Sequence, residues 1–294
     1  MEVKMIADSI SPQGIRITTM HLRYWRAIHS ELMTHRVFSR NARSSRAVPS
    51  RVLLTEPIFI PQFGINKPGM QSDILASPEL QAKWSREWQD LAAICRDHVE
   101  RWSEEGMHKQ HANRPLEWFG WIDVLVTATC WKNFFALRIS EYAQPEFDDL
   151  AKAMRGAMAV STPALLQPGQ WHLPYITQAD WDQAFSRNES QCRGSIHPYE
   201  LALGDVQRIS TARCARLSYR PFDGNADYEA EVARYEKLVV SQPVHASPAE
   251  HQATPDHLIG ESDEGLEWVW PKKHGNFRGW IQYRKTLPNE ALEG

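Results

Sequence analysis

Residues 35–46 read His35-Arg36-Val37-Phe38-Ser39-Arg40-Asn41-Ala42-Arg43-Ser44-Ser45-Arg46. This short stretch gathers basic, hydroxyl and amide side chains immediately after an amphipathic run. Arginine side chains can donate paired, charge-assisted hydrogen bonds to an anion, and the short hydroxyl groups can donate further ones. The same residues are also typical of a solvated basic turn at a helix end, where cations are favoured. The stretch by itself leaves both interpretations open.

The composition of the 294-residue chain is typical of a globular protein, with 42% hydrophobic and 23% charged residues. That length allows one large domain or two small ones. The net charge of -3 provides no general basic field for a nucleic acid polymer. Basic residues instead concentrate in 35–51, which favours a small anion as the ligand.

The lack of a recognisable targeting signal and the pattern of cysteines predict a cytoplasmic protein. No apolar stretch is long enough to cross a bilayer, and the start of the chain lacks the apolar core of a secretion signal. Four cysteines (Cys95, Cys130, Cys192 and Cys214) are scattered without a CxxC pair, which argues against a metal site and disulfides. Only Cys214, between Arg213 and Arg216, has an electropositive setting, so it is a minor candidate for a reactive thiol.

Periodicity predicts strands around Val3–Met5 and Ile15–Ile17, and then a helix that ends before His35. The proline-flanked segment 57–61 reads as a short strand. Ser77 and Pro78 begin a predicted helix that Gly106 ends. One apolar stripe of that helix is expected to be core: Trp84, Trp88, Leu91, Cys95, Val99 and Trp102.

Further helices are predicted over 124–137, 145–159, 199–218 and 227–240. Between them, 161–197 lacks any period and reads as a long linker with one short helix near 178–185. The tail from Thr254 is poorly patterned until Phe277, Trp280, Ile281 and Tyr283.

The spacing of the opening stretch closely resembles the signature of the flavin-dependent thymidylate synthases, Arg-His-Arg-x-x-Ser-x-Asn-x-x-Ser-x-Arg. Only the first arginine differs, being replaced here by Thr34. Three further segments resemble the same family. They are 133–138 with 143–147 (Asn-Phe-Phe-Ala-Leu-Arg, then Ala-Gln-Pro-Glu-Phe), 215–219 (Ala-Arg-Leu-Ser-Tyr) and 245–251 (His-Ala-Ser-Pro-Ala-Glu-His).

The order of these segments differs from that of the family, in which the last two precede the signature. The simplest interpretation is a circular permutation, with 161–207 joining the old termini and 252–294 forming an extra tail. The resemblance then implies one catalytic domain over 1–294 with an α+β fold, a sheet flanked by long helices. Residues just after His251 should end close to the start of the Ile15–Tyr24 strand, and 161–207 should cross the surface.

The resemblance also implies site residues. FAD would be held by His35, Arg36, Ser39, Asn41, Asn133, Ser218, Ser247 and Glu250, with His245 at the border of the flavin ring. The nucleotide dUMP would be held by Ser44, Arg46 and Arg138, with Arg114 as a further phosphate ligand. Arg138 and Ser44 would act in catalysis, Arg138 by polarising the base. We therefore expect His35, Arg36 and Asn41 to line one pocket with Ser247 and Glu250.

Arg138 can also be read as a helix-end cation that binds backbone carbonyls. Its neighbours Leu137 and Ile139 indicate partial burial, and a buried guanidinium needs a partner. The resemblance makes that partner the nucleotide rather than another residue of the chain.

Several positions depart from the family pattern. Thr34 replaces an arginine that binds phosphate, and Glu31 stands where glutamine is usual. Thr127 and Thr129 replace flavin-contacting Asn and Arg. Two aromatic positions also differ: Tyr142 replaces histidine, and Ala47 replaces a tyrosine.

Methylation of a pyrimidine at C5 can use an enzyme thiolate or a reduced flavin. The resemblance implies the flavin route, converting dUMP to dTMP with methylenetetrahydrofolate and NADPH in a homotetramer. Two alternatives remain open at this point. One is a related enzyme acting on another pyrimidine nucleotide such as dCMP, and the other is a non-catalytic nucleotide- or flavin-binding protein.

Overall fold

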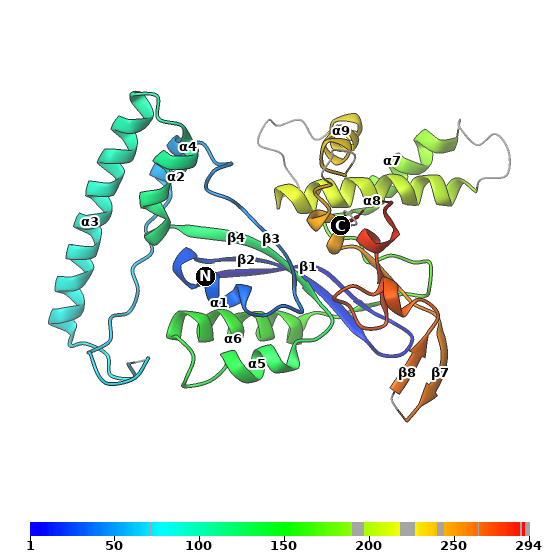
Figure 1. The fold of residues 1–294 in the computed structure, drawn as a ribbon, viewed down its shortest axis with the longest axis horizontal. Coiled ribbons are helices and arrows are strands. Elements are labelled where there is room, and N and C mark those ends of the chain that lie inside the picture. The colour runs from blue at the N-terminus through cyan, green and yellow to red at the C-terminus, as the bar shows by residue number, and fades with distance from the viewer. Residues whose placement is uncertain are drawn as a thin grey trace.

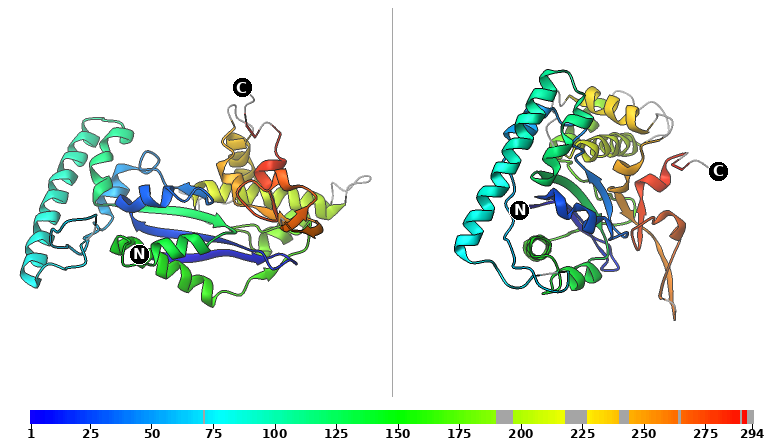
Figure 2. Two further views of the ribbon diagram at one scale, coloured as in Figure 1. Left: turned by 60° about the horizontal axis from the view of Figure 1, so that its bottom comes forward. Right: turned by 60° about the vertical axis from the view of Figure 1, so that its left-hand side comes forward.

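The computed structural model describes residues 1–70, 72–189, 197–217, 227–239, 244–263, 265–288 and 290–291. A mixed five-stranded sheet with the order β3-β4-β2-β1-β5 lies at its centre (Figure 1). Helices α5 and α6 lie on one side of the sheet, and α7, α8 and α9 lie on the other (Figures 1 and 2). The expected α+β fold, a sheet flanked by long helices, is confirmed.

The strands are β1 (Glu2–Ile10), β2 (Arg16–Trp25), β3 (Ser39–Ala42), β4 (Trp121–Ala128), β5 (Ala164–Leu165), β6 (Ala253–Pro255), β7 (Leu258–Ser262), β8 (Gly265–Trp268) and β9 (Trp280–Gln282). The α-helices are α1 (His29–Met33), α2 (Ser50–Thr55), α3 (Pro78–Glu104), α4 (Lys109–Ala112), α5 (Lys132–Arg138), α6 (Pro145–Val160), α7 (Gln178–Glu189), α8 (Pro198–Arg216) and α9 (Tyr228–Val239). Short 3-10 helices are η1 (Arg26–Ile28), η2 (Arg114–Trp118), η3 (Ser247–Glu250), η4 (Pro271–Lys273) and η5 (Tyr283–Thr286).

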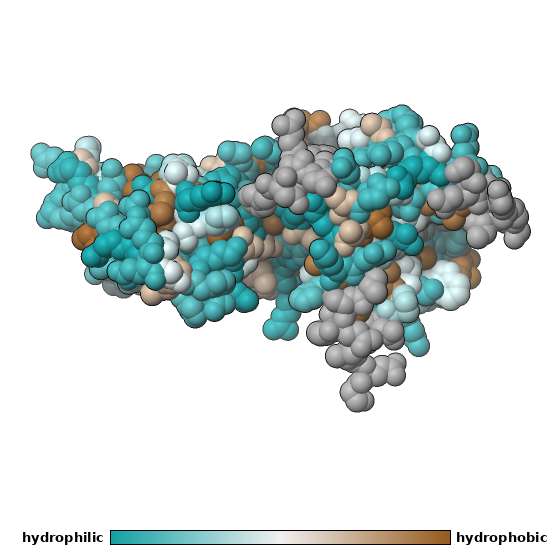
Figure 3. All heavy atoms as spheres, turned by 90° about the horizontal axis from the view of Figure 1, so that it is seen from above, coloured by the Kyte–Doolittle hydropathy of each residue, from teal (hydrophilic) through white to brown (hydrophobic). Residues whose placement is uncertain are grey.

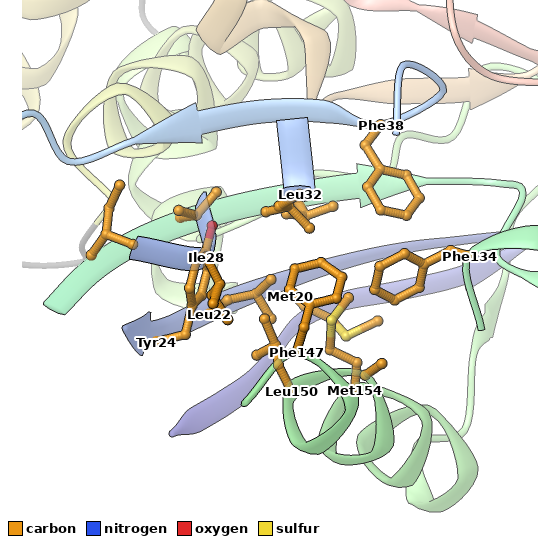
Figure 4. Close-up of a cluster of buried hydrophobic side chains, with 14 of the residues drawn as sticks. Met20, Leu22, Tyr24, Ile28, Leu32, Phe38, Phe134, Phe147, Leu150 and Met154 are labelled. Carbon is orange, nitrogen blue, oxygen red and sulfur yellow. The ribbon is translucent and has the colours of Figure 1, made fainter. Parts of the chain in front are cut away.

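The two faces of the sheet differ in polarity because neighbouring residues of a strand point to opposite sides. Met20 and Leu22 of β2 face the buried side of α6, where Phe147, Leu150 and Met154 complete the main core (Figure 4). Thr19, the residue before Met20, points to the other face, where it lies opposite Thr127 of β4. That second face carries polar groups and lies under α8.

Helix α6 follows the expected pattern. Pro145 opens it, and Glu146 and Asp148 place acidic groups in its first turn, where the helix dipole favours them. Its buried stripe holds the helix against the sheet. The predicted helices at 178–185, 199–218 and 227–240 correspond to α7, α8 and α9.

Helix α3 begins as expected, with the Ser77 hydroxyl accepting a hydrogen bond from the Leu80 amide. Gly106, at φ +90, follows its end. The expectation that its whole apolar stripe is core was wrong. Ala92 and Val99 are fully buried, whereas Leu91 is 51% exposed, because Leu91 lies on a different side of the helix from these two residues.

Two other element predictions were wrong. Residues 124–128, predicted as part of a helix, belong to strand β4, and the helix begins only at Lys132. The reason is that β4 is buried on both faces, so its apolar run lacks the alternation of an ordinary strand. Segment 57–61 forms no strand; it is held instead by a hydrogen bond from the Phe59 amide to the Phe119 carbonyl.

Residues 161–207 do not simply cross the surface, so that expectation was wrong. His172 and Tyr175 are each only 1% exposed. The Tyr175 carbonyl accepts a hydrogen bond from Arg213, and His172 pairs with Ala253 through backbone hydrogen bonds. This segment therefore contributes to the interior beside the polar face of the sheet.

The tail also packs where the permutation hypothesis requires it. Ala253, two residues after His251, shares a buried cluster with Ile17, Phe277 and Trp280, and the Trp280 indole donates to the Ile15 carbonyl (3.1 Å). However, β6 pairs with β9 and not with β2, so no continuous strand path joins the two segments. The permutation and the single catalytic domain remain predictions.

None of the helices in the described residues is long and apolar enough to span a membrane. The face seen in Figure 3 is mainly hydrophilic, with hydrophobic residues scattered among polar ones.

Candidate functional site

Arg138, the last residue of α5, lies within a polar cluster formed with the end of α1. Its Nη1 donates to Glu31 Oε2 (2.8 Å), and its Nη2 donates to the Thr34 hydroxyl (3.3 Å). Its Nε donates to His35 Nε2 (3.0 Å), and its Cζ lies 4.7 Å from the centre of the Phe147 ring. Arg138 therefore has partners within the chain, and the expectation that only a nucleotide would pair with it was wrong.

This cluster contains two departures from the family pattern. Glu31 and Thr34, which replace glutamine and arginine, are the side chains that bind the Arg138 terminal nitrogens. A guanidinium carries five N–H donors, and three are used here. One N–H on each terminal nitrogen is left for a ligand.

His35 is neutral where it accepts from Arg138. Burial, together with the nearby Arg138 and Arg40 charges, lowers the pKa of His35 to about 4. The ring packs edge-on against Phe134 and beside Phe38. His35 thus joins the Arg138 cluster to the main core and holds the guanidinium in a fixed orientation.

A pocket of about 480 Å³ opens beside this cluster. Glu31 and Arg138 line it with Gln144 and Glu146 from the start of α6, and Phe63 and Trp25 contribute apolar surface. Its volume is within the range of small-molecule sites. The pocket combines a fixed guanidinium, carboxylates and aromatic rings.

A second pocket, of about 400 Å³, brings together other predicted residues. Asn41 from β3, with His245 and Ser247 from the segment at η3, lines it next to Arg40. The Arg40 guanidinium donates to the Leu32 and Met33 carbonyls (3.2 and 2.8 Å). The predicted meeting of Asn41 and Ser247, more than two hundred residues apart in sequence, is therefore confirmed.

Other members of the predicted flavin set lie elsewhere. The Ser39 hydroxyl is buried and accepts hydrogen bonds from Gln282 (3.2 Å) and Asn276 (3.5 Å). Glu250 forms an ion pair with Arg284. Arg36 and Asn133 are exposed, and Ser218 lies outside the described residues. The expectation that His35, Arg36 and Glu250 share the pocket of Asn41 and Ser247 was wrong for a single chain.

The residues predicted to bind the nucleotide also lie in two separate places. Ser44 and Arg46 are exposed on the loop after β3. That loop is fixed by Asn113, whose amide donates to the Ser45 and Val48 carbonyls (2.8 and 3.0 Å). Arg114 pairs with Glu117 (2.9 Å), which also accepts from the Ser45 hydroxyl. Arg114 therefore lies near residues 43–46, the signature loop, whereas Arg138 contacts His35 at the start of the signature.

Four side chains that were not among the predicted site residues form a buried hydrogen-bonded chain on the polar face of the sheet. His172 Nε2 contacts the Thr19 hydroxyl (2.8 Å), which contacts the Thr127 hydroxyl (2.6 Å). Thr127 in turn contacts His251 Nδ1 (2.8 Å). Burial lowers the pKa of both histidines to about 3, so both are neutral. His251 stood within a quoted motif, but nothing in the sequence pointed to His172.

Cys214 is not a reactive thiol, which corrects its candidacy. It is fully buried, and burial raises the pKa of the thiol above its ordinary value. The Gln252 amide contacts its sulfur (3.4 Å), and Ser210 is a second polar neighbour. Within the described residues, His, Cys, Asp and Glu side chains form no cluster suited to a metal ion.

Comparison with known proteins gives one family match. The model described as "Thymidylate synthase complementing protein" matches residues 11–164, just over half of the chain. That range includes the signature loop and Arg138 but neither η3 nor the tail. The curated proteins contain no match.

Two of the solved structures similar to this chain are of one enzyme. The UMP/dUMP methylase PolB from Streptomyces cacaoi bound with 5-Br UMP has 17% identity and a TM-score of 0.47, covering 54% of this chain and 88% of that chain. The same methylase bound with 5-Br dUMP has 17% identity and a TM-score of 0.46, covering 54% of this chain and 89% of that chain.

Proposed function

Because this chain belongs to the thymidylate synthase complementing protein family, the flavin-dependent thymidylate synthases, we propose that it methylates dUMP at C5 to give dTMP. Methylenetetrahydrofolate would supply the carbon unit and NADPH the reducing equivalents. The observation that carries the proposal is Arg138. Its guanidinium is fixed by three residues of the chain and retains two free N–H donors beside a pocket of about 480 Å³.

Arg138 would bind and polarise the base. A planar guanidinium that is already oriented loses little freedom when it binds a carbonyl oxygen. Its N–H donors would stabilise negative charge on that oxygen in the enolate form of the base, and C5 of that form is the nucleophile that takes up the carbon unit. Neutral His35 would assist by holding the guanidinium in place without adding a second positive charge.

The second pocket fits the polar part of a flavin. Asn41, Ser247 and His245 offer amide, hydroxyl and imidazole groups, and Arg40 adds a positive charge. This donor set suits the carbonyl and phosphate oxygens of FAD. When bound there, reduced FAD would supply a hydride, while these residues would hold and orient it.

We also propose that a second copy of the chain completes each nucleotide site, as in a homotetramer. Ser44, Arg46 and Arg114 gather at the signature loop, whereas Arg138 lies in a separate cluster. With Thr34 in place of an arginine, the phosphate needs cations from another source. Arg46 and Arg114 of a neighbouring copy would supply them.

Complementation of a thymidine auxotroph tests the activity, with growth in the absence of thymidine as the expected result. The purified protein should be yellow, with a flavin absorbance band. A flavin-loaded protein that binds dUMP but supports no growth and forms no dTMP would favour the non-catalytic alternative. A protein that takes up neither flavin nor nucleotide would contradict the proposal.

A cytoplasmic location and a single domain over 1–294 belong to the same proposal. Sedimentation measures the oligomeric state of the flavin-loaded protein. We expect a homotetramer, and an active monomer would contradict a site shared between copies.

A further inference from the structure

The Arg138 pocket presents an unusual order of hydrogen-bonding groups to a ligand. Arg138 keeps one free N–H on each terminal nitrogen, since Nε, Nη1 and Nη2 each donate once within the chain. Glu31 lies beside Nη1 and engages it through Oε2 only. Within the described residues, Glu31 Oε1 has no hydrogen-bond donor of the chain. Both residues line the pocket, so a ligand there meets N–H donors of Arg138 and, next to Nη1, a carboxylate oxygen that accepts.

Pyrimidine bases differ in the order of these groups along one edge. Cytosine carries two acceptors, O2 and N3, followed by the amino group at C4, which donates. Uracil carries acceptor, donor and acceptor at O2, N3 and O4. Two donors followed by an acceptor complement the cytosine edge. Against uracil in the same orientation, an Arg138 N–H would face N3–H and the Glu31 carboxylate would face O4.

The charge of the pocket supports the same preference. Its charged residues, among those described, are Glu31, Arg138 and Glu146, so carboxylates outnumber cations. Glu146 is 7% exposed and accepts from the Gln144 amide (3.0 Å). Such a lining suits an amino group that donates hydrogen bonds and is poor for a phosphate, so the base rather than the phosphate belongs here.

We propose that this pocket also takes a cytosine nucleotide, and that Glu31 is the residue that determines which pyrimidine base is accepted. The inference rests on the proposed function, because it assumes that the base binds at Arg138. It extends that function from uracil nucleotides to cytosine nucleotides. Polar groups of the site that face unmatched groups of the wrong base weaken its binding.

Calorimetric titration of the flavin-loaded full chain with dCMP and dUMP tests the inference. The wild-type protein should bind dCMP at least as tightly as dUMP. Glu31→Gln places an amide that can donate to O4, and should shift the ratio of the two affinities toward dUMP by about tenfold or more. The matched control is Glu141→Gln, the same change at an exposed residue, which should leave the ratio unaltered.

The outcomes separate the two proposals. If wild type binds dUMP and binds dCMP at least tenfold more weakly, the cytosine inference is overturned and the proposed function stands. If the ratio of dCMP to dUMP affinity is the same in wild type and Glu31→Gln, Glu31 does not determine which base is accepted. If neither nucleotide binds the flavin-loaded protein, the nucleotide site at Arg138 is wrong and both proposals fall. Circular dichroism verifies that Glu31→Gln is folded.

Discussion

At the scale of single residues, the decisive feature is that Arg138 is held by the chain itself. Glu31, Thr34 and His35 orient three of its N–H groups, and Phe147 packs under the guanidinium. Arg138 is therefore both a proposed catalytic group and a link between α1, α5 and α6. Removing it should affect stability as well as turnover, in contrast to an arginine that waits unpaired for a ligand.

Arg138→Lys should lower the rate of dTMP formation from dUMP at least tenfold. An ammonium group can keep the ion pair with Glu31 but cannot also donate to His35 and Thr34 in one plane. Turnover assays on the flavin-loaded protein measure the effect, and circular dichroism measures folding. Arg155→Lys, an exposed change on α6, is the control. Normal turnover of Arg138→Lys would show that the planar guanidinium group is not needed for the reaction.

The buried histidines predict a dependence of stability on pH. Burial lowers the pKa of His172 and of His251 to about 3, below the ordinary value of 6.5. Between these values the unfolded chain binds protons that the folded chain does not. The free energy of unfolding should therefore decrease as pH falls from about 6.5 to 3, by up to about 1.4 kcal/mol per pH unit for each histidine.

Urea denaturation from pH 7 to pH 4 measures this dependence. His172→Gln should show a shallower slope than wild type, because one of the buried histidines with a lowered pKa is gone. His257→Gln, at an exposed position, should leave the slope unchanged. Equal slopes for wild type and His172→Gln would mean that His172 is protonated in the folded protein.

At the scale of elements, α6 supplies the main contact between the helical layer and the sheet. Leu150 is fully buried in the core that α6 forms with the sheet, whereas Val160 at the end of the same helix is 87% exposed. Leu150→Ala should cost about 2–5 kcal/mol of unfolding free energy, because it leaves a cavity in the core. Val160→Ala should cost less than about 0.5 kcal/mol. Chemical denaturation of both variants measures the difference, and similar losses would contradict the observed orientation of α6.

At the scale of the whole molecule, the tail is part of the structural core rather than an appendage. Trp280 is fully buried against Ile17 and Ala253, whereas Trp270 in the same tail is 49% exposed. Trp280→Ala should therefore cost about 3–5 kcal/mol. Trp270→Ala should cost less than about 1 kcal/mol. Thermal and urea denaturation compare the two, and a Trp280→Ala protein as stable as wild type would show that the tail folds apart from the sheet.

The sequence by itself determined the features that depend on neighbours in the chain. Ser77 as a cap, Pro145 at a helix start and the stripe of Phe147, Leu150 and Met154 are local patterns, and the structure contains each of them. The signature stretch at 35–46 likewise identified the family, because the spacing of its side chains is a property of the sequence alone.

Only the tertiary structure decided which side chains meet. An apolar run such as 124–128 reads equally as a helix or as a buried strand until its partners β2 and β3 are known. Glu31 and Arg138 are more than a hundred residues apart, and no periodicity links an ion pair across that distance. The separation of the signature loop from Arg138, and the burial of His172, follow from how the layers pack. Long-range contacts are fixed by packing between elements, and a local pattern carries no information about them.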